Sequence, residues 1–201
     1  MAAASHVPFV GLTGGMGAGK STALAALGRL GAATLSTDEV VHELYEDPEV
    51  ISLVVGRWGE RVAPGGVVNR SAVANAAFAA PEEREWLEQL LWPRVAERVA
   101  AFRDEAQSRR PAPRAAVVET PLLFEAGMDA AYDATIAVVA DEDVRAQRAA
   151  TRGHQAADER AARQLSQEEK ARRATFAVQN SGTIEELEWT LSDVLGKLNP
   201  L

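Results

Sequence analysis

The segment from Gly14 to Ser21 has the residue types and spacing needed to bind a nucleoside triphosphate. It reads Gly-Gly-Met-Gly-Ala-Gly-Lys-Ser and matches the pattern G-x-x-x-x-G-K-[ST]. Glycines let backbone N–H groups turn toward phosphate oxygens, and a following helix N-terminus adds positive potential. Lys20 would reach the β- and γ-phosphates, and the Ser21 hydroxyl would bind magnesium. The pattern predicts a phosphate loop; the alternative is a glycine-rich turn with a solvated lysine.

Two carboxylates follow strands that we predict to be neighbours. Asp38 comes just after the second predicted strand, and the carboxyl ends of parallel strands gather around one crevice. This position suits a residue near the transferred phosphate, but a helix N-cap explains Asp38 equally well. Glu119 ends the third predicted strand and would hold magnesium through water, as a Walker B acid does. A solvent-facing carboxylate at the strand end is the alternative.

Three arginines are spaced to share one helix face. Arg145, Arg148 and Arg152 are separated by three and four residues. Such a row would stabilise the charge that spreads over a transferring phosphoryl group. The alternative is a solvated face, because acidic residues precede the row.

Apolar runs and breakers predict an α/β fold with a parallel sheet covered on both faces. The predicted strands span residues 9–13, 33–36, 115–118, 134–139 and 175–178. The main predicted helices span 20–30, 39–45, 141–173 with an interruption near Gly153, and 184–195. Residues 48–110 have helical composition, broken at Pro64-Gly65-Gly66. The four tryptophans occupy helical positions and are predicted to lie in the core.

The composition of the chain indicates which binding partners and which cellular location to expect. The 201 residues include 21 Lys and Arg against 29 Asp and Glu, a net charge of -8 that argues against nucleic acid binding. The chain has no Cys, which excludes a disulfide framework and a thiolate metal site. Residues 1–8 contain no Lys or Arg and precede only five apolar residues. We therefore expect no signal peptide, no membrane span and a cytoplasmic protein.

Residues along nearly the whole chain resemble the dephospho-coenzyme A kinase family. Many kinases share the phosphate loop, here Leu12 to Thr22, whereas the segment Pro121-Leu122-Leu123-Phe124-Glu125, in this order with the other matching residues, is specific. Further matching residues are Gln147, Arg148, Arg152, Gln164, Lys170, Asn180-Ser181-Gly182, Val68-Asn69-Arg70, Phe78, Trp86-Leu87 and Pro93.

The resemblance implies a fold and an activity. The activity is transfer of the γ-phosphoryl group of ATP to the ribose 3′-hydroxyl of dephospho-coenzyme A, the last step of coenzyme A synthesis. The implied fold is a P-loop three-layer sandwich with a five-stranded parallel sheet. Residues 9–47 and 113–201 would form the nucleotide-binding core with a lid at about 145–172, residues 48–112 the helical acceptor-binding insert, and residues 1–8 a tail. The partners would be small molecules only, and the expected assembly is a monomer.

The resemblance also implies residue roles. Asp38 becomes the general base, with Lys20, Arg148 and Arg152 as further catalytic residues. ATP would contact Gly14, Gly15, Met16, Gly17, Ala18, Gly19, Lys20, Ser21, Thr22 and Asn180. The acceptor would contact Thr13, Asp38, Arg70, Pro121, Leu122 and Leu123, and magnesium would be bound by Ser21 and Glu119.

This chain departs from the family pattern at three positions. Ser36 stands where the family usually has the first Asp of an Asp-Ala-Asp motif, Trp92 replaces a His, and Glu119 replaces an Asp. From the core motifs alone, two other functions remain open. One is a P-loop kinase that acts on a nucleoside monophosphate or a sugar-like hydroxyl. The other is a nucleotide-binding switch that changes protein partners.

Overall fold

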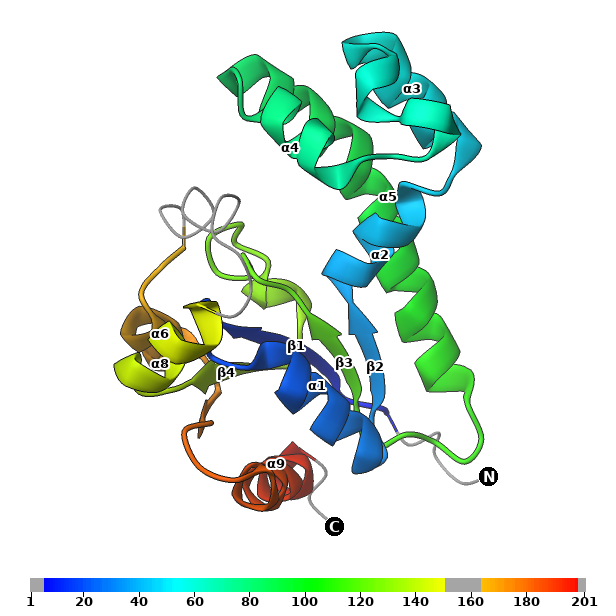
Figure 1. The fold of residues 1–201 in the computed structure, drawn as a ribbon. Helices are drawn as coiled ribbons and strands as arrows, with labels where there is room; N and C mark the ends of the chain where they lie inside the picture. The colour runs from blue at the N-terminus through cyan, green and yellow to red at the C-terminus, as the bar shows by residue number, and fades with distance from the viewer. Residues whose placement is uncertain (1–5, 151–163, 199–201) are drawn as a thin grey trace. The chain divides into compact units, whose positions relative to one another are not determined.

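The computed structural model describes residues 6–150 and 164–198, and Figure 1 shows their fold. Within these residues the chain forms one five-stranded sheet with every neighbouring pair parallel. The strand order is β2-β3-β1-β4-β5. The strands are β1 (Phe9–Gly14), β2 (Ala33–Ser36), β3 (Ala116–Glu119), β4 (Ala134–Val139) and β5 (Phe176–Gln179). The predicted five-stranded parallel sheet is therefore confirmed.

Both faces of the central strand β1 are covered, which explains its continuous apolar sequence. Because side chains alternate along a strand, Val10 and Leu12 point to one face. They join the main core with α1 (Lys20–Arg29) and α9 (Ile184–Leu198). On the other face Phe9 stacks on Tyr132 with ring centroids 4.7 Å apart. The sheet therefore forms the middle of three layers.

Two further α-helices lie between β4 and β5 in the described residues. Helix α6 (Glu142–Ala150) begins three residues after β4, and α8 (Gln167–Arg173) precedes β5. Helix α8 contacts β4, β1 and β5. A short 3-10 helix, η3 (Asp129–Ala131), leads into β4. Since β1 lies between β3 and β4, the carboxyl ends of these three strands form one edge, which is where open parallel sheets bind ligands.

The chain folds into two compact units, one made of Met1–Ser36 and Ala101–Leu201, the other of Thr37–Ala100. The second unit consists of α2 (Thr37–Leu44), α3 (Pro48–Trp58), η1 (Glu60–Val62), η2 (Pro64–Gly66), α4 (Arg70–Ala77) and the first part of α5 (Pro81–Ser108). The sequence-based division placed its insert at 48–112 instead, and the functional roles of these parts stay predictions.

Local signals explain the helices of the second unit. Helix α3 is capped by Asp47, whose carboxylate accepts a hydrogen bond from the Glu49 N–H at 2.8 Å. Asn69 caps α4 in the same way through the Ala72 N–H at 3.0 Å. The apolar side chains of this unit pack around the fully buried residues Val50, Val54 and Val62.

The structure corrects the N-cap hypothesis for Asp38. Helix α2 begins at Thr37, directly after β2 ends at Ser36, so Asp38 lies inside the first helical turn. No residue separates the strand from the helix, whereas the predicted helix start at position 39 left residues 37 and 38 between them. Asp38 therefore does not have the position of a capping residue.

The prediction that all four tryptophans lie in the core is also wrong. Trp92 is 57% exposed and Trp189 is 77% exposed. Trp189 lies two residues from the buried Leu187 and Leu191, so a helix places it on the opposite face of α9. Trp92 stands in the same relation to Leu90, which is buried. Among the described helices, none combines the length and apolar character that crossing a membrane requires.

Candidate active site

The phosphate loop joins β1 to α1, and its glycines adopt conformations that other residues rarely reach. Gly17 has φ 75°, and Gly19 has φ 86° and ψ 35° in the left-handed region directly before α1 begins at Lys20. A Cβ atom on Gly17 would lie 2.6 Å from the carbonyl oxygen of Arg145. The loop therefore needs glycine at position 17 for its backbone angles and for the close approach of α6.

Lys20 folds back over the loop that precedes it. Its Nζ donates hydrogen bonds to the carbonyl oxygens of Gly14 at 3.2 Å and Gly15 at 3.4 Å. The side chain is half-buried, so the ammonium is only partly exposed to water. A positive charge is thus held within the loop, as the predicted contact with phosphate requires.

Residues that follow β4 and β5 in the chain form hydrogen bonds at the phosphate loop. Asn180 is buried, and its Nδ2 donates to the Ala18 carbonyl at 2.8 Å. Arg148 Nη1 donates to the Asn180 carbonyl at 2.9 Å, and Arg145 Nε donates to the Met16 carbonyl at 3.1 Å. Asn180 and Arg148, both predicted site residues, therefore lie at the loop.

Arg145 and Arg152 are the other two members of the predicted arginine row. Arg145 was part of the predicted row but received no place in the site, although it contacts the loop directly. Its signal was the spacing of three residues from Arg148 on α6. Arg152 lies outside the described residues, and the predicted lid at 145–172 is described only in part.

The residues predicted to bind magnesium supply oxygen atoms, which suit this ion. Ser21 and Thr22 are exposed in the first turn of α1. Glu119 is buried at the carboxyl end of β3, in register with Leu12 of β1. Among the described residues no group of three or more His, Cys, Asp or Glu could hold a metal ion. A magnesium ion here would need further oxygens from the triphosphate and water, as P-loop sites generally use.

The residues assigned to the acceptor fall into two groups. Thr13 is buried at the end of β1, and its Oγ1 donates to the Pro121 carbonyl at 3.3 Å. Pro121 and Leu122 are half-buried, but the Leu123 side chain is fully buried against Gly11, which leaves it a packing role. Asp38 and Arg70 are exposed and belong to the second unit, in the first turns of α2 and α4.

The sequence analysis gave no role to a buried ion pair that lies beside Thr13 and Pro121. The Lys170 side chain is 0% exposed, and its Nζ lies 3.0 Å from Glu125 Oε1. Loss of solvation by burial lowers the pKa of Lys170, while the hydrogen bond and charge of Glu125 act to raise it. Both residues are among those that resemble the family, but within α8 Lys170 stands among Glu168, Glu169, Arg172 and Arg173, a pattern typical of a solvated helix.

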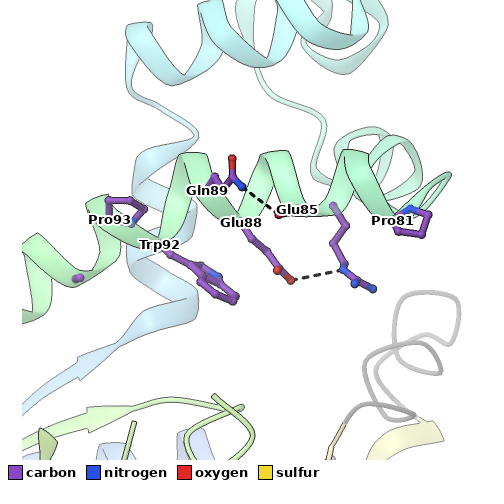
Figure 2. A pocket seen from close by; sticks show the side chains of 8 residues that line it. Pro81, Glu85, Glu88, Gln89, Trp92 and Pro93 are labelled. Atoms are coloured by element: carbon purple, nitrogen blue, oxygen red, sulfur yellow. Dashed lines mark hydrogen bonds and ion pairs between the residues drawn. The ribbon is translucent and has the colours of Figure 1, made fainter. Parts of the chain in front are cut away.

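The second unit carries a groove along α5, drawn in Figure 2. Its volume is about 820 Å³. The exposed Trp92 and Pro93 lie toward one end and Pro81 toward the other, with Glu85, Glu88 and Gln89 between them. Glu85 and Gln89 are joined by a hydrogen bond of 3.2 Å.

Comparison with known proteins places these features in a family context. The family model described as dephospho-CoA kinase matches residues 8–186. A dephospho-CoA kinase of Deinococcus radiodurans is 36% identical over 197 residues, covering 96% of this chain and 94% of the relative. One from Chlorobaculum tepidum is also 36% identical, over 199 residues and 94% of each chain. A crystal structure from Thermus thermophilus has a TM-score of 0.78 at 33% identity and covers 97% of this chain and 100% of the other.

Proposed function

Because the chain belongs to the dephospho-CoA kinase family, we propose that its phosphate loop acts with Asp38, Arg148 and Arg152 in phosphoryl transfer to dephospho-coenzyme A. The protein is a kinase of dephospho-coenzyme A and acts at the final step of coenzyme A biosynthesis. ATP is the phosphoryl donor that the family implies. The proposed target is the ribose 3′-hydroxyl of the acceptor. The cytoplasm supplies ATP and is the proposed location; the proposed assembly is a monomer.

The observation that carries the residue assignment is the set of contacts around the phosphate loop. Asn180 and Arg145 bind its carbonyl oxygens, and Lys20 places a positive charge within it. These contacts hold the loop in shape before nucleotide arrives, so its backbone N–H groups need little rearrangement to receive the phosphates. The proposed ATP contacts are Gly14 to Thr22 together with Asn180.

Magnesium fits the oxygen donors near the loop, with Ser21 as the proposed ligand and Glu119 as the proposed carboxylate. When bound, the ion would neutralise charge that develops on the triphosphate. Ser21 contributes its hydroxyl from the exposed first turn of α1. Glu119 contributes a buried carboxylate from the end of β3.

On the acceptor side, Asp38 would orient the ribose hydroxyl and accept its proton as the new bond forms. A hydroxyl is a poor nucleophile near neutral pH, and the exposed carboxylate in the first turn of α2 is accessible to a ligand. Arg70, exposed at the start of α4, would bind the diphosphate of the acceptor. Pro121 and Leu122 would contact the acceptor beside the end of β1.

A substrate panel tests the proposed acceptor. A coupled ADP-release assay should give rapid turnover with dephospho-coenzyme A and little turnover with AMP, GMP or shikimate. Nuclear magnetic resonance of the product should show the new phosphate on the ribose 3′-oxygen. Faster turnover with AMP or shikimate would favour a different small-molecule kinase. Nucleotide binding without transfer to any acceptor would favour a switch.

Replacing Arg148 by Lys should lower kcat/KM for ATP by roughly tenfold, because a lysine cannot reproduce the planar fork of arginine. Arg148 already reaches the Asn180 carbonyl beside the loop, so its charge is close to the proposed phosphates. Steady-state kinetics at varied ATP measure the effect. The control is Arg172→Lys, which changes an exposed arginine of α8 paired with Glu169. Equal kinetics for the two variants would show that Arg148 does not contact the triphosphate.

A further inference from the structure

The buried ammonium of Lys170 binds three oxygen atoms that come from two separate parts of the chain. Its Nζ donates to the Pro121 carbonyl at 2.6 Å and lies 3.0 Å from Glu125 Oε1. At 3.5 Å it also donates to Oγ1 of Thr13, which itself donates to the Pro121 carbonyl. One side chain of α8 thus connects the end of β1 with the segment that follows β3.

Stability alone does not account for a charge at this position. Burying an ammonium and a carboxylate costs solvation free energy that their attraction often fails to recover, and well-packed neutral replacements are often tolerated. Docking of α8 does not account for it either, because Gln167 independently ties this helix to Ala140, the residue after β4. The Gln167 side chain exchanges two hydrogen bonds with the backbone of Ala140, at 3.0 and 3.2 Å.

We propose that Lys170 is a positioning residue for the acceptor: it holds the Pro121 carbonyl and the Thr13 hydroxyl and so fixes Pro121 and Leu122 beside the start of the phosphate loop. Glu125 supports this role by holding the ammonium, and its Oε1 also accepts a hydrogen bond from the Leu165 N–H at 2.8 Å. The inference rests on the proposed function, specifically on Pro121 and Leu122 as acceptor contacts.

The contacts of Lys170 and those of the proposed nucleotide site are separate, which gives the inference a specific kinetic consequence. The loop is held by Asn180 at Ala18 and by Arg145 at Met16, and neither contact involves Lys170. Loss of the ammonium should therefore weaken use of the acceptor and leave ATP affinity unchanged. A purely structural role would lower both together with the melting temperature.

The test uses a charge-free pair, because Lys170→Met alone would leave the Glu125 carboxylate buried without its partner. In the double variant Lys170→Met/Glu125→Gln, the new amide oxygen can still accept from the Leu165 N–H. We expect a melting temperature close to wild type and an unchanged ATP dissociation constant by calorimetry. We expect kcat/KM for dephospho-coenzyme A to fall roughly tenfold, the scale of one lost hydrogen bond.

Two further variants make the result decisive. Gln167→Ala loosens α8 without touching Pro121, and we expect it to leave kcat/KM for the acceptor near wild type. Leu122→Ala tests the acceptor segment directly and should raise KM for dephospho-coenzyme A. Wild-type kinetics in the double variant would overturn the role of Lys170; so would a double variant that does not fold, a matching loss of ATP affinity, or the same acceptor defect in Gln167→Ala.

The same experiments separate this inference from the proposed function. If Leu122→Ala impairs acceptor use and the double variant does not, only the role of Lys170 is wrong. If neither variant affects acceptor use, the assignment of the Pro121 segment is wrong as well. If wild-type protein does not phosphorylate dephospho-coenzyme A, the proposed acceptor itself is wrong.

Discussion

Replacing Lys20 by Ala should reduce turnover with dephospho-coenzyme A by about a hundredfold or more while the protein remains folded, the scale of a lost electrostatic donor. The Lys20 ammonium lies within hydrogen-bond distance of the Gly14 and Gly15 carbonyls, so its charge is held inside the phosphate loop. That charge would follow the transferring phosphoryl group and stabilise the transition state more than the bound substrates. Steady-state kinetics and thermal melting of the same preparation measure the two parts of the prediction.

Lys197→Ala is the matched control for this experiment. Lys197 is an exposed lysine of α9 that pairs with Asp193, far along the chain from the loop. The same loss of charge at position 197 should leave turnover near wild type. Wild-type turnover in a folded Lys20→Ala protein would contradict the phosphate-binding role of Lys20.

Asp38→Asn should lower kcat by about a hundredfold or more, the scale of a lost general base, with little change in ATP affinity. The amide keeps part of the geometry of the carboxylate but cannot accept the proton of the ribose hydroxyl. Melting temperature should change little, because Asp38 is exposed and does not occupy the capping position of α2. Kinetics at saturating ATP and acceptor, with calorimetry for ATP binding, measure these effects.

Glu39→Gln provides the comparison, since Glu39 is the neighbouring carboxylate in the same first turn and is also exposed. Both substitutions remove one negative charge near the N-terminus of α2, so their effects on stability should be similar and small. Only the Asp38 variant should lose turnover. Equal kcat values for the two variants would exclude Asp38 as the general base.

Sequence patterns predicted the sheet well because its three central strands, β3, β1 and β4, are buried on both faces. The predicted strand at 33–36 and the one at 134–139 match β2 and β4 residue for residue, and the other three differ by one residue at one or both ends. Continuous apolar runs bounded by glycine and proline mark where such buried strands begin and end. The phosphate loop could also be predicted from the sequence, because its local backbone conformation requires glycines.

Features set by contacts between distant segments could not be predicted in the same way. Lys170 lies between Glu168, Glu169, Arg172 and Arg173, so its surroundings in the sequence resemble a solvated helix. Its burial depends on Pro121 and Glu125, which are more than forty residues away. An N-cap stayed an equal alternative for Asp38 because nothing in the sequence shows that β2 runs directly into α2. The exposure of Trp92 likewise depends on which face of α5 packs.

The order of the strands has a consequence for association between copies of the chain. The sheet ends in β2 on one side and β5 on the other, and each of these edge strands has four residues, whereas β1 and β4 in the middle have six. An edge strand of this length exposes only about two outward N–H and C=O pairs. Short edges give an incoming strand few hydrogen bonds to extend, so the sheet is a poor template for fibrous aggregation.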